Sequence, residues 1–150
     1  MPSRYSGTKE EVRALSAYIN LMRAADSLIG RTQPGLEKAG LTLSQLGVLE
    51  ALRHCGAMCQ SALGEKLLRS EASVTSVLEK LEKRGLVART RSKEDRRFRT
   101  VELTAKGRAV IEKVFPEHAR TITEAFGALK PAEQEELRRL CRVLGRGCCG

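Results

Sequence analysis

The feature that most constrains this chain is a change of hydrophobic period at Gly85. Before it, apolar side chains recur at the spacing of one α-helix face, at Val74, Val77, Leu78 and Leu81. After it, residues 86–91 and 99–103 follow the period of two that is typical of half-buried strands. Glycine also accepts the left-handed turn that commonly ends a helix. The pattern therefore predicts a helix over about residues 70–84, followed directly by a two-stranded hairpin.

The tip of this hairpin and the segments beside it are strongly basic. Residues 80–99 contain nine Lys or Arg side chains and three Asp or Glu, a net charge of +6, whereas the whole chain carries +9. Charge at this density favours an anionic partner, either nucleic acid or an anionic membrane surface. Aromatic residues make up only 3% of the chain, which disfavours single strands bound by base stacking. A nucleic acid duplex is therefore the expected partner.

Two shorter helices are predicted before the basic region. Thr42 can cap a helix that runs to about Cys55 and ends at Gly56, and another follows over about residues 59–68. Three helices and a hairpin with a basic tip form a winged helix-turn-helix, whose third helix enters the major groove by its first turns. The outward side chains of that third helix are Ala72, Ser73, Ser76, Lys80 and Lys83. On an isolated helix such a face would be ordinary solvated surface, but the basic hairpin beside it favours contact with DNA.

A longer helix is predicted at the N-terminal end. Thr8 and Glu11 form a capping-box pattern that begins a helix to about residue 30. Gln-Pro-Gly at residues 33–35 is expected to break or bend this segment, which ends at residues 38–40. The helix carries two apolar stripes, so we expect it to be buried against a partner subunit as well as against its own core.

Two more helices are predicted after the hairpin. The first begins after Thr104, continues to about residue 129 and should be kinked by Pro116. His118 on its apolar stripe is expected to be a packed histidine of the core or of a helix seam, in preference to a ligand. The last helix begins at Pro131. Its inward stripe is expected to be Leu137, Leu140, Cys141 and Leu144. The tail from Gly145 has no pattern and is expected to be loose.

These elements predict a mainly α fold with a small β-hairpin. The winged helix-turn-helix occupies residues 41–104, and residues 1–40 with 105–150 form a helical dimerisation region. The chain lacks an apolar run long enough for a membrane span or a secretory signal. We therefore expect a cytoplasmic protein without a membrane partner, whose five cysteines are reduced.

Two stretches of the chain resemble the MarR (multiple antibiotic resistance regulator) family. The first, at residues 73–87, reads Ser-Val-Thr-Ser-Val-Leu-Glu-Lys-Leu-Glu-Lys-Arg-Gly-Leu-Val. The second, at residues 95–107, reads Asp-Arg-Arg-Phe-Arg-Thr-Val-Glu-Leu-Thr-Ala-Lys-Gly. The resemblance implies a homodimeric bacterial transcription regulator, expected to be a repressor, that binds an inverted-repeat operator in double-stranded DNA. Helices from both ends of the chain would form the dimer interface.

The resemblance also implies which residues bind DNA. In the third helix these are Ser73, Thr75 and Ser76, which would touch bases or phosphates, with Ser70 and Lys80 nearby. Arg69, Asp95, Arg96, Arg97 and Arg99 complete the expected DNA-binding set. Asp95 would hold the wing by pairing with Arg97, whose side chain would reach into the minor groove. Many family members carry Arg where this chain has Ser76, so base specificity should depend more on the wing, on hydroxyl contacts and on DNA shape.

Family members often sense small aromatic compounds or oxidants, so the resemblance implies release from DNA by a small aromatic ligand or an oxidant. We expect no metal or other cofactor. We also expect no enzymatic activity, because the chain has no nucleophile with a matching base, no glycine-rich phosphate loop and no paired carboxylates in a credible cleft.

Two other classes of function stay open. Cys55 and Cys59 lie close together in the sequence with His54 adjacent, which suits a thiol- or metal-sensing protein on the same scaffold. His-Cys-x3-Cys supplies at most three ligands, however, whereas structural zinc sites take four. The remaining alternative is a winged-helix module that binds another protein in place of DNA.

Overall fold

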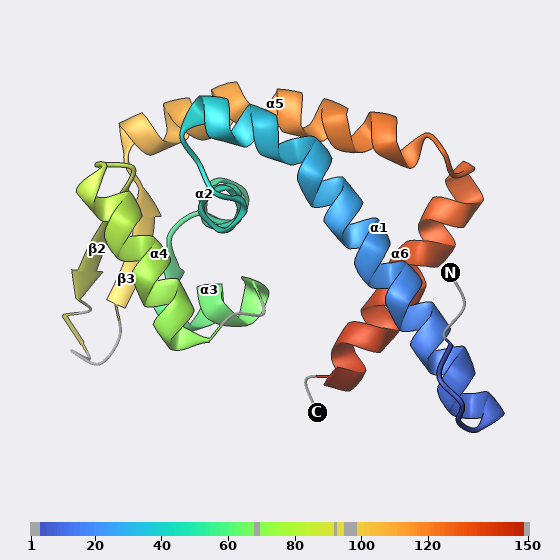
Figure 1. Ribbon diagram of the computed structural model, residues 1–150. Helices are drawn as coiled ribbons and strands as arrows, with labels where there is room; N and C mark the ends of the chain where they lie inside the picture. Colours follow the sequence, from blue (N-terminus) through green and yellow to red (C-terminus); the bar gives the residue numbers. More distant parts are fainter. Residues whose placement is uncertain (1–3, 68–69, 92, 95–98, 149–150) are drawn as a thin grey trace. The chain divides into compact units, whose positions relative to one another are not determined.

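The computed structural model of the protein describes residues 4–67, 70–91, 93–94 and 99–148 (Figure 1). The fold is mainly helical with a small three-stranded antiparallel sheet, which confirms the predicted fold class. The elements in chain order are α1 (Lys9–Ala39), α2 (Leu43–Cys55), β1 (Met58–Cys59), α3 (Gln60–Leu67), α4 (Glu71–Lys83), β2 (Val87–Arg91), β3 (Arg99–Leu103), α5 (Ala105–Phe126) and α6 (Pro131–Cys148). No helix among the described residues is long and apolar enough to cross a lipid bilayer.

The chain forms two compact units, and both boundaries between them fall inside a helix. One unit is Gly30–His118, and the other comprises Met1–Ile29 and Ala119–Gly150. The C-terminal part of α1 and the N-terminal part of α5 therefore belong to the winged-helix unit, because their side chains Leu36 and Ile111 are buried in its core. The boundaries at residues 29/30 and 118/119 thus differ from the functional division at 40/41 and 104/105, which stays a prediction.

The core of the winged-helix unit is built from the inward faces that the hydrophobic periods predict. The side chains that are at most 1% exposed include Leu49, Leu52, Leu63, Leu78, Leu81, Val101 and Ile111. Burying one such side chain contributes roughly 1.5–3 kcal/mol. In α4, Val74 is also buried and Val77 is half-buried. The prediction that this face of α4 points inward is confirmed, and with it the exposure of the opposite face.

Hydrogen bonds at the helix N-termini confirm the predicted caps. The Thr8 hydroxyl accepts from the Glu11 backbone N–H at 3.1 Å, and the Glu11 carboxylate accepts from the Thr8 N–H at 2.8 Å. Thr42 and Gln45 exchange the same pair of bonds at the start of α2, each 3.1 Å long. Such side chains satisfy backbone N–H groups that the first helical turn leaves unpaired. Just after the C-terminal end of α4, Gly85 adopts a φ of 73°, which is the left-handed turn that the sequence predicts there.

The sheet contains one strand that the sequence pattern did not predict. β3 pairs with β2 as the expected hairpin, and on its other edge it pairs with β1, where Met58 lies opposite Val101 and Cys59 opposite Thr100. The helix expected from Cys59 therefore begins one residue later, at Gln60. A strand of two residues has no period to detect, and its pairing partner is distant in the sequence.

The expected break in α1 at Pro34 and the expected end of α5 were wrong, whereas α1 ends at Ala39, within the predicted residues 38–40. α1 continues through Pro34 to Ala39, with no break at residues 33–35. Thr32 and Leu36 are buried on either side of this proline, so tertiary packing holds the helix across the hydrogen bond that proline removes. α5 likewise contains Pro116 and ends at Phe126, earlier than expected.

The C-terminal helix also differs from its prediction. α6 extends to Cys148, so residues 145–148 are helical although their sequence lacks an amphipathic pattern, and the expectation of a loose segment there was wrong. Cys141 is exposed, which contradicts its expected place in the core, and Leu140 and Leu144 are 49% and 55% exposed. The stripe is apolar as predicted, but among the described residues only Leu137 of the stripe is half-buried, and the other three side chains are exposed.

Candidate DNA-binding surface

The outward face of α4 presents short polar side chains and lysines. Ala72, Ser73, Ser76, Lys80 and Lys83 are all exposed. Ser70 is the N-cap: its hydroxyl accepts from the Ser73 backbone N–H at 3.2 Å and donates to the Ser73 hydroxyl at 3.0 Å. The N-terminus of α4 therefore combines backbone N–H groups, exposed hydroxyls and the positive end of the helix dipole, which suits phosphate and base contacts.

Thr75 occupies a different position from the other hydroxyl residues of α4. Its side chain is half-buried and accepts a hydrogen bond from Gln60 Nε2 at 2.8 Å. This bond joins the start of α3 to α4 and so sets how the two helices of the helix-turn-helix lie together. Gln60 was absent from the sequence-based site, because a lone glutamine at a helix start carries no signal of its partner.

The two strands of the hairpin carry basic side chains toward its tip. Arg91 and Arg99 are exposed and lie opposite each other in the β2–β3 register. The remaining candidates, Arg69, Asp95, Arg96 and Arg97, lie outside the described residues. The expected pairing of Asp95 with Arg97 and the minor-groove contact of Arg97 stay predictions.

Arg89 belongs to the basic run but binds within the protein. Its Nε and Nη2 atoms donate to the two carboxylate oxygens of Glu82, at 3.3 and 3.1 Å. The Arg89 side chain is only 12% exposed, so it is less accessible to phosphates than its neighbours. This bidentate pair links the C-terminal end of α4 to β2 and so holds α4 and the hairpin in one arrangement. The Arg89 guanidinium lowers the pKa of the Glu82 carboxyl, mainly through the hydrogen bond.

The Glu82–Arg89 pair should make stability depend on pH. Because the Glu82 pKa is lower in the folded than in the unfolded protein, the pair stabilises the fold above the ordinary carboxyl range near pH 4. This contribution is lost as the pH falls through the folded-state pKa. The wild-type protein should therefore lose more stability than Glu82→Gln between pH 6 and about pH 3, as measured by urea unfolding at each pH. Glu79→Gln, at an exposed position of the same helix, should follow the wild-type curve, and parallel wild-type and Glu82→Gln curves would contradict the role of the pair.

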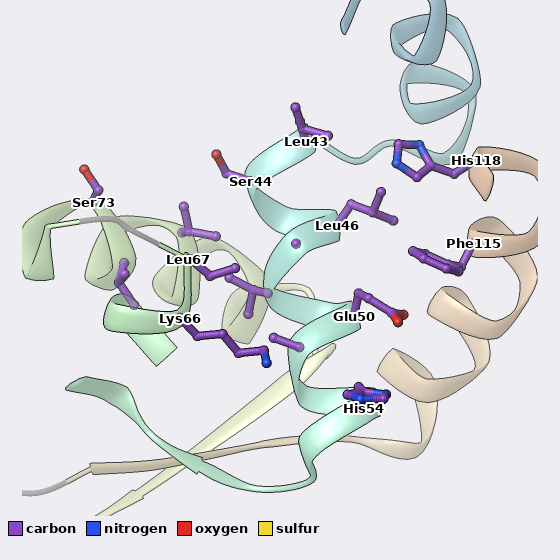
Figure 2. Close-up of a pocket in the computed structure, with 15 residues that line it drawn as sticks. Leu43, Ser44, Leu46, Glu50, His54, Lys66, Leu67, Ser73, Phe115 and His118 are labelled. Carbon is purple, nitrogen blue, oxygen red and sulfur yellow. The ribbon is translucent and has the colours of Figure 1, made fainter. Parts of the chain in front are cut away.

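A cavity of about 440 Å³ lies around α2 in the winged-helix unit (Figure 2). Its lining includes Ser73, Val74 and Val77 of α4, together with Phe115 and His118 of α5. The Phe115 and His118 rings are 6.0 Å apart and tilted by 45°. His118 is half-buried, and burial lowers the pKa of its imidazole, so the ring is predominantly neutral at pH 7. The ring of His118 contacts Phe115, which packs against the core, and its side chain also lines the cavity.

The cysteines do not gather with other metal ligands in the described part of the chain. Cys55 is exposed and Cys59 is half-buried in β1, with its sulfur 3.0 Å from the Ser61 hydroxyl. The hydrogen bond from Ser61 lowers the pKa of the Cys59 thiol. Among the described residues, no group of three or more His, Cys, Asp or Glu side chains is placed to hold a metal ion.

The three helices α2–α4, the hairpin and the exposed face of α4 define a winged-helix DNA-binding protein. The MarR family model matches residues 41–98. MhqR of Bacillus subtilis, an HTH-type transcriptional regulator, is 32% identical over 133 residues, which cover 89% of this chain and 92% of that protein. The chain belongs to the MarR family of DNA-binding transcriptional regulators.

Solved structures of family members share the fold over most of their length. BpsR of Bordetella bronchiseptica is 32% identical with a TM-score of 0.78, and the match covers 86% of this chain and 98% of that chain. Sco3205 of Streptomyces coelicolor, a MarR family regulator solved in complex with DNA, has a TM-score of 0.85 at 22% identity, covering 97% of this chain and 92% of that chain.

Proposed function

We propose that this protein is a repressor that binds an inverted-repeat operator as a homodimer and is released by a small ligand. The observation that carries the proposal is the exposed hydroxyl and lysine face of α4, next to a hairpin whose strands carry exposed arginines. A helix of this kind reads base edges in the major groove, while arginine suits the negative potential of a narrow minor groove. Two such units related by a two-fold axis read half-sites about one helical turn, or roughly 10 bp, apart.

Exposed apolar side chains at both ends of the chain support the dimer. In α1 and α6 they are Leu15, Tyr18, Met22, Ile29, Leu140, Val143 and Leu144, each at least 36% exposed. Monomeric proteins rarely leave so many large apolar side chains in contact with water. Burial of these faces against a second copy would remove that cost and place two winged helices on one operator.

We assign DNA contacts to Ser70, Ser73, Ser76, Lys80 and Arg99, which are exposed on α4 and β3. Arg69, Asp95, Arg96 and Arg97 complete this assignment through the resemblance to the family. Thr75 has a further role in the proposal: its hydroxyl oxygen accepts from Gln60 and so positions the helix, while its O–H remains able to donate to DNA.

The cavity beside α2 supports regulation by a small ligand. Its wall includes Ser73 at the N-terminal end of α4 and Val74 and Val77 on the inward face of that helix. A ligand that changes the packing of these side chains would move the residues proposed to touch bases. In BpsR, DNA binding is regulated by 6-hydroxynicotinic acid, a molecule with one aromatic ring, and a cavity of about 440 Å³ has room for a molecule of that size.

The test is fluorescence-anisotropy binding of the reduced protein to its own upstream promoter DNA and to a scrambled duplex, over a series of salt concentrations. We expect strong preference for the promoter and a steep loss of affinity with salt, because bound lysines and arginines release counterions from phosphates. Arg97→Ala should weaken binding and lower the slope of log Kd against log salt by about 1 for each subunit. Light scattering in the same buffer should give twice the chain mass of 16.5 kDa.

Weak and equal binding to both duplexes, unchanged in Arg97→Ala, would refute the assignment of the wing. A monomer in solution would refute the dimer and with it the inverted repeat.

A further inference from the structure

The cavity around α2 has two parts of different chemistry, which lie on opposite sides of that helix (Figure 2). The part facing α5, here called the α5 lobe, is lined by Leu46, Glu50, His54, Phe115 and His118. Residues 46, 50 and 54 follow one another at intervals of four and so share one face of α2. Lys66 lies on the opposite side of α2, where α3 and α4 line the cavity.

The α5 lobe contains two buried polar atoms without a hydrogen-bond partner in the described part of the chain: Glu50 Oε2 and His118 Nδ1. A buried polar atom that lacks a partner is costly, by about 1–3 kcal/mol. A carboxylate can only accept hydrogen bonds, and a neutral imidazole has one accepting nitrogen. A bound molecule with hydrogen-bond donors could therefore satisfy atoms that the protein leaves unpaired, while Phe115 and Leu46 offer contact to a flat ring.

The charges around the lobe discriminate between classes of aromatic ligand. Among the described residues that line the cavity, Glu50 is the one acidic side chain and Lys66 the one lysine, and Lys66 is exposed on the other side of α2. A ligand carboxylate inside the α5 lobe would meet the Glu50 carboxylate, and none of the described residues that line the lobe is an arginine or lysine that could offset the repulsion.

We propose that the α5 lobe binds an uncharged aromatic molecule that donates hydrogen bonds to Glu50 and His118, and that it rejects aromatic carboxylates. The inference deepens the proposed function, on which it rests, by naming the chemical class of the releasing ligand. Glu50 is the specificity-determining residue, since its charge sets which rings can enter.

The test compares two probes with the same ring and hydroxyl group, 4-hydroxybenzamide and 4-hydroxybenzoate. Their dissociation constants are measured by isothermal titration calorimetry on the whole chain at pH 7.5. The wild-type protein should bind the amide about tenfold or more tightly than the acid. Glu50→Gln should bring the two constants to within roughly threefold of each other, because the negative charge is gone and the new amide can donate to a carboxylate.

Glu112→Gln is the matched control. It removes one negative charge from α5 at an exposed side chain that does not line the cavity, so it should keep the wild-type preference. His118→Leu gives a second line of test: it removes one acceptor and should weaken binding of the amide without improving binding of the acid.

Equal affinities in the wild-type protein, tighter binding of the acid through Lys66, or no binding of the amide at millimolar concentration would overturn the proposal. An unchanged preference in Glu50→Gln would overturn the role of Glu50. The DNA affinity of the ligand-free wild-type protein is measured in parallel. If the ligand-free wild-type protein did not bind its promoter DNA, the proposed function would be contradicted. The comparison of the two probes would still decide the chemistry of the lobe.

Discussion

The Ser76→Glu variant should bind operator DNA roughly a hundredfold more weakly than the wild-type protein at about 0.1 M salt. Ser76 is exposed on the outward face of α4, three positions from Ser73 and four from Lys80. A carboxylate at this position would face the phosphates and base edges that the helix is proposed to touch. A cost of about 1.4 kcal/mol in each half-site corresponds to tenfold for each subunit of a dimer. The fold should not change, because the side chain points into solvent.

Two controls separate a local contact from a change in total charge. Ser76→Ala removes the hydroxyl alone and should weaken binding by less than about tenfold. Ala128→Glu adds the same charge at an exposed position between α5 and α6, in the other compact unit, and should leave affinity near the wild-type value. If Ala128→Glu were as harmful as Ser76→Glu, net charge alone would explain the loss and α4 would not be the recognition helix. Circular dichroism on all three variants checks that the fold is intact.

The Gly107→Ala variant should lose about 3 kcal/mol or more of unfolding free energy, or fail to fold. A Cβ atom at this position would lie 1.9 Å from the Leu86 carbonyl oxygen and 2.9 Å from its carbon, both backbone atoms. The Leu86 carbonyl cannot move freely, because it accepts the Thr104 backbone N–H at 3.2 Å. The Thr104 hydroxyl in turn accepts from the Gly107 N–H at 3.0 Å and donates to the Gly85 carbonyl at 2.6 Å. One added methyl group therefore disturbs the junction of α4, the hairpin and α5 together.

Urea unfolding measures this effect, with Gly30→Ala as the matched control. Gly30 lies inside α1, and a Cβ there would meet nothing within 4 Å. Because alanine is the better helix former, Gly30→Ala should raise the unfolding free energy by about 0.5–1 kcal/mol. Equal stabilities of Gly107→Ala and the wild-type protein would mean that α5 does not pack on the Leu86 backbone at this distance.

The sequence by itself determined the elements whose causes are local. The caps at Thr8 and Thr42 depend on hydrogen bonds across three positions, and the inward face of α4 depends on a period of 3.6 residues. The hairpin follows from a period of two on either side of a basic loop. Each of these patterns involves residues that lie within one helix or one hairpin, so the patterns can be identified from the sequence alone. The exposed part of the proposed DNA surface, such as Ser73 and Ser76, followed from the same helical period.

The tertiary structure alone decided which distant residues meet. It engages Thr75 of the expected DNA-binding set with Gln60, and it pairs Arg89 of the basic run with Glu82 within the protein. It also adds β1, carries α1 through Pro34, and leaves Cys141 on the surface.

The α5 lobe is a further result of this kind, because Glu50 of α2 and His118 of α5 face one cavity although the sequence separates them widely. No local pattern encodes such pairs. A hydrogen bond or a buried polar atom depends on the direction in which two separate elements pack, whereas period and capping depend only on near neighbours along the chain.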